Sequence, residues 1–246
     1  MDRIIYYTLS ALAVLLILTI HEYSHAYAAY KLGDGTAKSC GRLSLNPIKH
    51  LDPVGALCMI VFRFGWARPV PINARNFRKP KRDFAICALA GPLSNLISAF
   101  FSAFLYLLLF RLFRGISFES EFTFNLAKNS LLFVSLFHSI NIGIGIFNLI
   151  PVPPLDGSRI LNVILPTKVY FGIMKHERNI YLGLLAWLLL GGYVKNALLS
   201  ISFVAGSPVL SFIAGIFSLS DMIGSLIVLL SEAMLDFWQL IPFLKF

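Results

Sequence analysis

His21-Glu22-Tyr23-Ser24-His25 is the stretch on which the interpretation of this chain depends. It follows residues 4–20, which carry no charged side chain, so three ionisable groups end an apolar run. Two histidines four residues apart lie on one face of a helix and can bind the same Zn²⁺. The intervening Glu22 can take a proton from a water molecule that the metal activates. Ionisable groups at membrane depth are costly and are functional candidates. The stretch therefore predicts a helical zinc site with its own general base, and the alternative is a structural role for buried His and Glu side chains.

The composition indicates a membrane protein. Of the 246 residues, 57% are hydrophobic and 13% are charged, whereas a soluble domain carries about 25% charged residues. The net charge is +9, but the basic residues gather between apolar segments, where they set membrane topology and do not indicate nucleic acid binding. The cysteines Cys40, Cys58 and Cys87 are odd in number and form no C-x-x-C pair, so neither a disulfide framework nor a thiolate zinc site is indicated.

Long apolar segments predict an all-α polytopic fold with five to six transmembrane helices. Residues 4–30, 84–110, 129–150 and 179–194 give four spans, and residues 196–220 and 222–243 add one or two more. We expect the first span to be uncleaved, because signal-peptide cleavage would remove the histidine motif. Gly91-Pro92 is expected to interrupt the first half of the second span.

The segment between the first two spans is strongly basic. Residues 31–82 contain eleven Lys and Arg and only two acids, Asp34 and Asp52, so this side of the membrane is predicted to be cytoplasmic. Within it, residues 54–62 form a nine-residue apolar run, which is too short for a spanning helix. The run predicts a small β-hairpin or a re-entrant segment after the first helix.

Following the chain through the bilayer brings two distant segments to one depth. The first span ends on the inner side with its histidine motif, and the third span returns to that side with Asn148 and Asp156. A catalytic zinc commonly has three protein ligands and an open position for water. Asp156 is the best candidate for the third ligand, while Asp34 and Asp52 are rivals that lie in the basic loop.

Four stretches together resemble the site-2 protease family of intramembrane zinc metalloproteases, in a short form without PDZ or CBS domains. They are His21 to His25, Gly41-Arg42-Leu43-Ser44-Leu45-Asn46-Pro47, Ala90-Gly91-Pro92-Leu93-Ser94-Asn95, and residues 148–157, which fit N-x-x-P-x-P-x-L-D-G. The resemblance covers about residues 20–160, and the order of the motifs is more specific than any one of them.

The resemblance implies a site and an activity. One Zn²⁺ per chain would be held by His21, His25 and Asp156, with Glu22 as catalytic acid and base. Asn148 would position the substrate or stabilise the oxyanion, and Asn95 would be a supporting polar group. The substrates would be transmembrane segments of membrane proteins, cut in regulated intramembrane proteolysis. The chain would be a multi-pass protein of the bacterial inner or plasma membrane, in contact with lipid and not with nucleic acid, with its active site nearer the cytoplasmic side.

We expect one membrane-embedded peptidase domain over residues 1–246, with a catalytic core at about 4–165 and hydrophobic C-terminal helices at about 179–244. Two other functions use the same residues. A membrane metal or ion transporter could use the His and Asp cluster as a transport site, but the repeated halves common in transporters are not visible in the sequence. An inactive relative could bind helices as a chaperone without cutting them, although every motif position is intact.

Overall fold

The computed structural model of the chain describes all residues except 1, 53–54, 56–67, 202–206, 211–217 and 246. The described part is mostly helical and contains no strand. Its helices are α1 (Asp2–Lys31), α2 (Thr36–Ser39), α4 (Pro80–Arg114), α5 (Glu121–Leu149), α6 (Asp156–Ile164), α7 (Thr167–Met174), α8 (Glu177–Leu199) and α11 (Leu219–Gln239), with short 3-10 turns η1 (Pro47–Lys49), η2 (Ala74–Asn76) and η3 (Pro242–Leu244).

Four of these helices, α1, α4, α5 and α8, are long and apolar enough to cross a membrane. They coincide with the four spans expected at residues 4–30, 84–110, 129–150 and 179–194. The total of five or six spans stays a prediction, and the expected hairpin or re-entrant segment at residues 54–62 lies, apart from Gly55, outside the described residues. The interruption expected at Gly91-Pro92 is wrong, because α4 continues through Pro92 as one helix of 35 residues. Neighbouring helices allow such a proline in a membrane helix.

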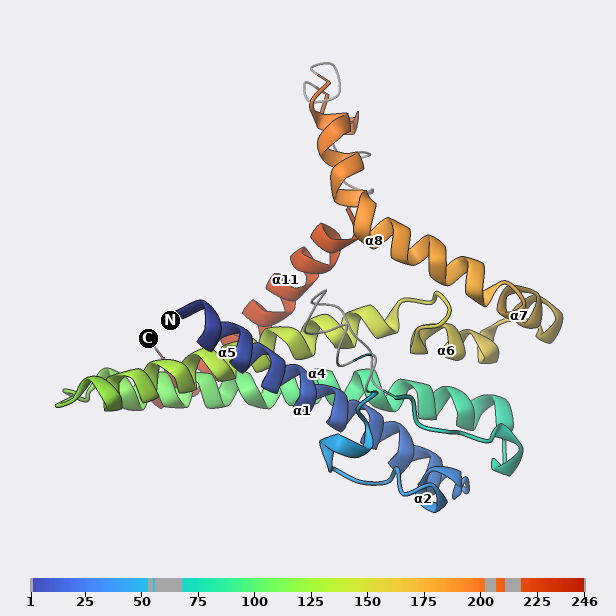
Figure 1. Ribbon diagram of the computed structural model, residues 1–246, viewed down its shortest axis with the longest axis horizontal. Helices are drawn as coiled ribbons and strands as arrows, with labels where there is room; N and C mark the ends of the chain where they lie inside the picture. The colour runs from blue at the N-terminus through green and yellow to red at the C-terminus, as the bar shows by residue number, and fades with distance from the viewer. Residues whose placement is uncertain (1, 53–54, 56–67, 202–206, 211–217, 246) are drawn as a thin grey trace.

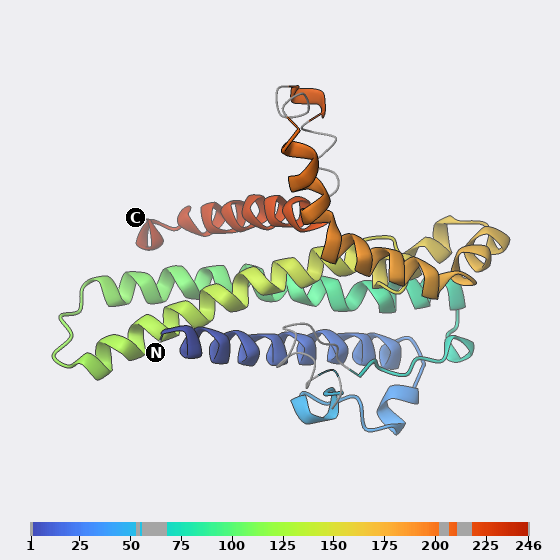
Figure 2. The same ribbon diagram turned by 45° about the horizontal axis from the view of Figure 1, so that its top comes forward.

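Helices α1, α4 and α5 lie side by side and form the body of the molecule (Figures 1 and 2). Small residues line their contacts: Ala13, Ala26 and Ala29 on α1 and Ala99 and Ala103 on α4 are all fully buried. Small side chains let helix backbones approach closely, which is the usual way in which helices associate in a bilayer. The close approach places the C-terminal half of α1 directly against α4.

The C-terminal helices pack back onto this body. Leu155, Leu184 and Leu219 form a buried cluster that joins the turn before α6 to α8 and α11. Helix α11 is also held by polar contacts, because the Trp238 indole donates to the carbonyl oxygen of Phe100 over 2.8 Å. His138 of α5 is buried and lies 2.9 Å from the Ser231 hydroxyl of α11, which makes it an interior hydrogen-bonded histidine.

A buried carboxylate ties the loop after α1 to the segment that leads into α4. Asp34 is fully buried, and its carboxylate accepts hydrogen bonds from the Thr36 N–H, the Asn73 N–H and the Asn76 amide at 2.7 to 3.0 Å. The sequence placed Asp34 in a basic loop and did not indicate its burial, because donors about 40 residues away leave no local signal. Burial raises the pKa of Asp34, but these hydrogen bonds outweigh it and hold the pKa below its ordinary value.

Replacing this carboxylate, in Asp34→Ala, should lower the free energy of unfolding by about 1–3 kcal/mol, since buried N–H donors lose their acceptor. Thermal unfolding in detergent measures the effect, with Asp236→Asn on exposed α11 surface as the control. Because the folded-state pKa of Asp34 is depressed, its contribution is fully present above the ordinary pKa of about 3.9. The difference between wild type and variant should therefore shrink as pH falls below that value, and a difference independent of pH would contradict this role.

Candidate metal centre

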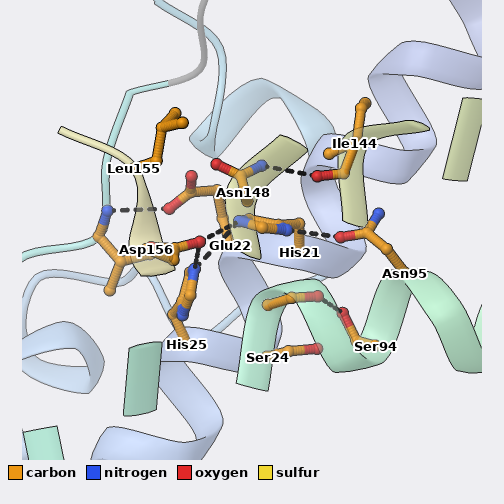
Figure 3. Close-up of polar contacts among 12 residues, drawn as sticks. His21, Glu22, Ser24, His25, Ser94, Asn95, Ile144, Asn148, Leu155 and Asp156 are labelled. Carbon is orange, nitrogen blue, oxygen red and sulfur yellow. Dashed lines mark hydrogen bonds and ion pairs between the residues drawn. The ribbon is translucent and has the colours of Figure 1, made fainter. Parts of the chain in front are cut away.

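The C-terminal half of α1 presents both motif histidines to α4 and to the start of α6. His21 and His25 stand one helical turn apart, and each is only 5–6% exposed. Their Nε2 atoms lie 3.0 Å from each other, and their rings meet edge to face (Figure 3). The two rings thus point into one place between the helices, as the spacing of the motif predicts.

A chain of hydrogen bonds fixes the orientation of the His21 ring. The Asn141 amide donates to the carbonyl oxygen of Phe137, which can only accept. The Asn141 side-chain oxygen must therefore accept from the Asn95 amide, over 2.9 Å, and the Asn95 oxygen must accept from Nδ1–H of His21. The carbonyl oxygen of Phe137 thus determines the direction of every hydrogen bond in this chain. Because Nδ1 of His21 carries the proton, its Nε2 lone pair is left free for a ligand.

His25 is held in the same tautomer by the backbone of α4. Its Nδ1–H donates over 2.8 Å to the carbonyl oxygen of Cys87, while the Cys87 thiol contacts the carbonyl oxygen of His25. A carbonyl oxygen can only accept, so Nε2 of His25 also carries a free lone pair. Contacts of this kind on the far ring nitrogen are typical of metal-binding histidines.

The third candidate ligand, Asp156, lies at the start of α6. Helix α5 ends at Leu149, and the chain turns through residues 150–155 before α6 begins at Asp156. The Asp156 carboxylate lies 3.1 Å from Nε2 of His21 and 3.2 Å from Nε2 of His25. Gly157 permits this approach, because a Cβ there would lie 2.2 Å from the carbonyl oxygen of Leu149.

The donor set fits a zinc ion. Ligand atoms of His21, His25 and Asp156 all lie within 4.8 Å of one another. The closest approaches are 3.0 to 3.2 Å, near the roughly 3.3 Å edge of a zinc tetrahedron with bonds of about 2.0 Å. Two imidazole lone pairs and a carboxylate that face each other repel unless a cation lies between them. Among the described residues no fourth protein ligand joins the cluster, which leaves a position for water.

Glu22 and Asn148 belong to the same neighbourhood but do not contact the three donor atoms (Figure 3). The Glu22 carboxylate accepts a hydrogen bond from the Val70 N–H over 3.0 Å. The Asn148 amide donates to the carbonyl oxygen of Ile144 on its own helix, which uses one of its two hydrogens. Each residue therefore keeps part of its hydrogen-bonding capacity for a ligand.

In the structure His21 contacts His25, Asp156 and Asn95, whereas the rival acids Asp34 and Asp52 have other partners. Asp34 serves the loop contacts described above, and Asp52 accepts from the Gly55 N–H over 2.8 Å. Sequence reasoning missed the backbone groups of Cys87 and Val70, which no side-chain pattern shows. It also missed that residue 91 must lack a side chain, because a Cβ there would lie 2.4 Å from Nε2 of His25. The position of Gly91 in the Ala90 to Asn95 motif could have suggested this.

The apolar helices and the cluster of His21, His25 and Asp156 fit a membrane metallopeptidase. The comparison with protein families makes this specific, because the profile of peptidase family M50 matches residues 9–191. The chain belongs to peptidase family M50, the site-2 protease family, and is a zinc metalloprotease.

Two relatives support this assignment. A Bacillus subtilis protein named "Putative zinc metalloprotease YwhC" is 46% identical over 174 residues, which are 69% of this chain and 77% of the relative. A Mycolicibacterium smegmatis protein named "Putative zinc metalloprotease Rip2" is 29% identical over 147 residues, which are 58% of this chain and 52% of the relative. No solved structure matches the chain.

The candidate metal centre requires a glycine where α4 passes the histidines. A Cβ on residue 91 would lie 2.4 Å from Nε2 of His25 and 2.7 Å from Cε1 of His21, closer than packed atoms allow. Gly91→Ala should therefore displace the rings and lower zinc affinity by about 10-fold or more. Zinc per chain, measured by mass spectrometry after dialysis against a weak chelator, reports the loss.

Gly224→Ala on α11 is the control for this prediction, since nothing lies within 4 Å of its added Cβ. It should keep the wild-type zinc content. Full zinc occupancy in Gly91→Ala would show that α4 does not approach the histidines as closely as described.

Proposed function

We propose that this chain is an intramembrane zinc endopeptidase that cleaves transmembrane segments of other membrane proteins. The observation that carries the proposal is the convergence of His21, His25 and Asp156 within 4.8 Å, on and beside a helix apolar enough to cross a membrane. Glu22 is adjacent in sequence to one of these groups and carries a carboxylate suited to general base catalysis. In this proposal the three converging residues are the metal ligands of a single peptidase domain.

The residues of the site have separate roles in peptide hydrolysis. Zinc, when bound, supplies a Lewis acid that polarises a carbonyl and acidifies water. Glu22 takes the proton of the attacking water at a carboxylate oxygen and passes it to the leaving amine. Asn148 offers its second amide hydrogen to the developing oxyanion or to the substrate backbone. Asn95 keeps His21 in the tautomer whose Nε2 can bind metal.

The expected substrate is a membrane-spanning helix that can unwind locally. In a bilayer a helix satisfies all of its backbone hydrogen bonds internally, so its carbonyls are not accessible until a turn opens. A helix with residues of poor helix propensity near one membrane face is the substrate class that this site would accept most readily. The lipid bilayer is then a constant partner of the enzyme.

The orientation of the site follows from the distribution of charge. The metal centre lies toward the Lys31 end of α1, and the connection from there to α4 contains most of the basic residues of the first half of the chain. Basic connecting segments favour the cytoplasmic side, so we place the active site nearer that face of a multi-pass protein. The Bacillus and Mycolicibacterium relatives support a bacterial membrane.

The test uses the purified protein in liposomes with a panel of transmembrane peptides, followed by mass spectrometry of the products. Wild type should cut within the apolar segment, and Glu22→Gln should lower kcat by about 100-fold or more while keeping one zinc per chain. Asp156→Ala should lose both zinc and cleavage. Glu232→Gln, which alters an exposed carboxyl on α11, is the matched control and should cut like wild type.

Two results would contradict the proposal. Cleavage that survives Glu22→Gln would remove the catalytic assignment. Zinc binding without cleavage of any peptide, together with metal flux into the liposomes, would favour a transporter that uses the same histidine and aspartate cluster.

A further inference from the structure

The segment after the basic loop reaches the proposed catalytic base through its backbone. The Val70 N–H donates to Oε2 of Glu22 over 3.0 Å, although the two residues are 48 positions apart. This is the one hydrogen bond that the Glu22 carboxylate makes with the residues the structure describes. Because the two residues are so far apart in sequence, tertiary structure and not local geometry brings them together.

The sequence around Val70 isolates this donor. Pro69 and Pro71 flank it, and a proline has no N–H, so Val70 carries the only backbone donor of the three residues. Each proline also fixes its own φ and restricts the residue before it to extended conformations, here Arg68 and Val70. The Arg68-Pro69-Val70-Pro71 segment is therefore stiff before it contacts Glu22.

Contacts on both sides hold this segment in place. The Arg68 N–H donates to the carbonyl oxygen of His50 over 2.8 Å, and the Asn73 N–H donates to Asp34 over 2.7 Å. The Val70 side chain is buried against Ala26 and Ala37. Ala26 follows Glu22 by one turn on α1, so the side chain of Val70 anchors on the same face of the helix that its N–H contacts.

We propose that the Val70 N–H is a positioning group for Glu22 and that the two prolines serve to present it. The inference rests on the proposed role of Glu22 as general base. With Oε2 held by Val70, the carboxylate cannot rotate freely, and Oε1 remains the oxygen that receives the proton from water. A carboxylate with one oxygen fixed loses little freedom in the transition state, so the contact raises kcat and leaves substrate binding unchanged.

The decisive comparison is Val70→Pro against Val70→Ala in the peptide cleavage assay. Val70→Pro removes the N–H, whereas Val70→Ala keeps it and removes only two methyl groups. We expect kcat of Val70→Pro to fall about 10- to 100-fold relative to Val70→Ala, with KM and zinc content as in wild type. In the Glu22→Gln background, Val70→Pro should cause no further loss of the residual kcat, because the contact acts through Glu22.

Equal kcat in Val70→Pro and Val70→Ala would overturn the inference, and so would a further loss in the Glu22→Gln background, which indicates a general structural role. If Val70→Pro does not fold, α-hydroxyisovaleric acid introduced at position 70 replaces the N–H by an ester oxygen and keeps the side chain, and the same two criteria apply. The proposed function fails separately, when Glu22→Gln itself cleaves at the wild-type rate.

Discussion

Three electron-rich groups face one another at the centre of this protein, and the rest of the fold serves to hold them there. The lone pairs of two imidazole nitrogens and a carboxylate meet at 3.0 to 3.2 Å, an arrangement that is unfavourable without a cation. Backbone carbonyl oxygens of α4 and α5 fix the orientation of the two imidazole rings. Phe137 and Cys87 each accept a hydrogen bond that determines, directly or through two asparagines, which ring nitrogen carries the proton. Both rings are buried, and these contacts hold their orientations without the help of a metal.

Packing of small residues makes this geometry possible. Alanines on α1 and α4 bring the two helices close, and Gly91 lets α4 pass the histidine rings without a clash. Gly157 does the same for the start of α6, where any side chain would overlap the last carbonyls of α5. The C-terminal helices add a second layer of support, because the leucine cluster around Leu155 braces the turn that carries Asp156. Residues remote from the cluster thereby help to determine the position of Asp156, one of its three candidate ligands.

Side chains with regular spacing could be located from the sequence, and backbone contacts could not. The i, i+4 histidines and the four long apolar spans follow from helical periodicity and hydropathy, and the topology of the first three spans brings Asp156 to the depth of His21. The continuity of α4 through Pro92 was not predictable, because tertiary packing decides whether a membrane helix tolerates a proline. The burial of Asp34 depends on donors about 40 residues away, and the contact of Val70 with Glu22 depends on a backbone N–H, so neither leaves a local pattern.

X-ray absorption at the zinc edge on the purified protein tests the central claim most directly. We expect nitrogen and oxygen ligands at about 2.0–2.2 Å with the scattering pattern of two imidazole rings, and little zinc signal in Asp156→Ala. A sulfur ligand near about 2.3 Å would instead point to Cys40, Cys58 or Cys87. A third imidazole would point to His50, His138 or His176, and either result would contradict a zinc centre built from His21, His25 and Asp156.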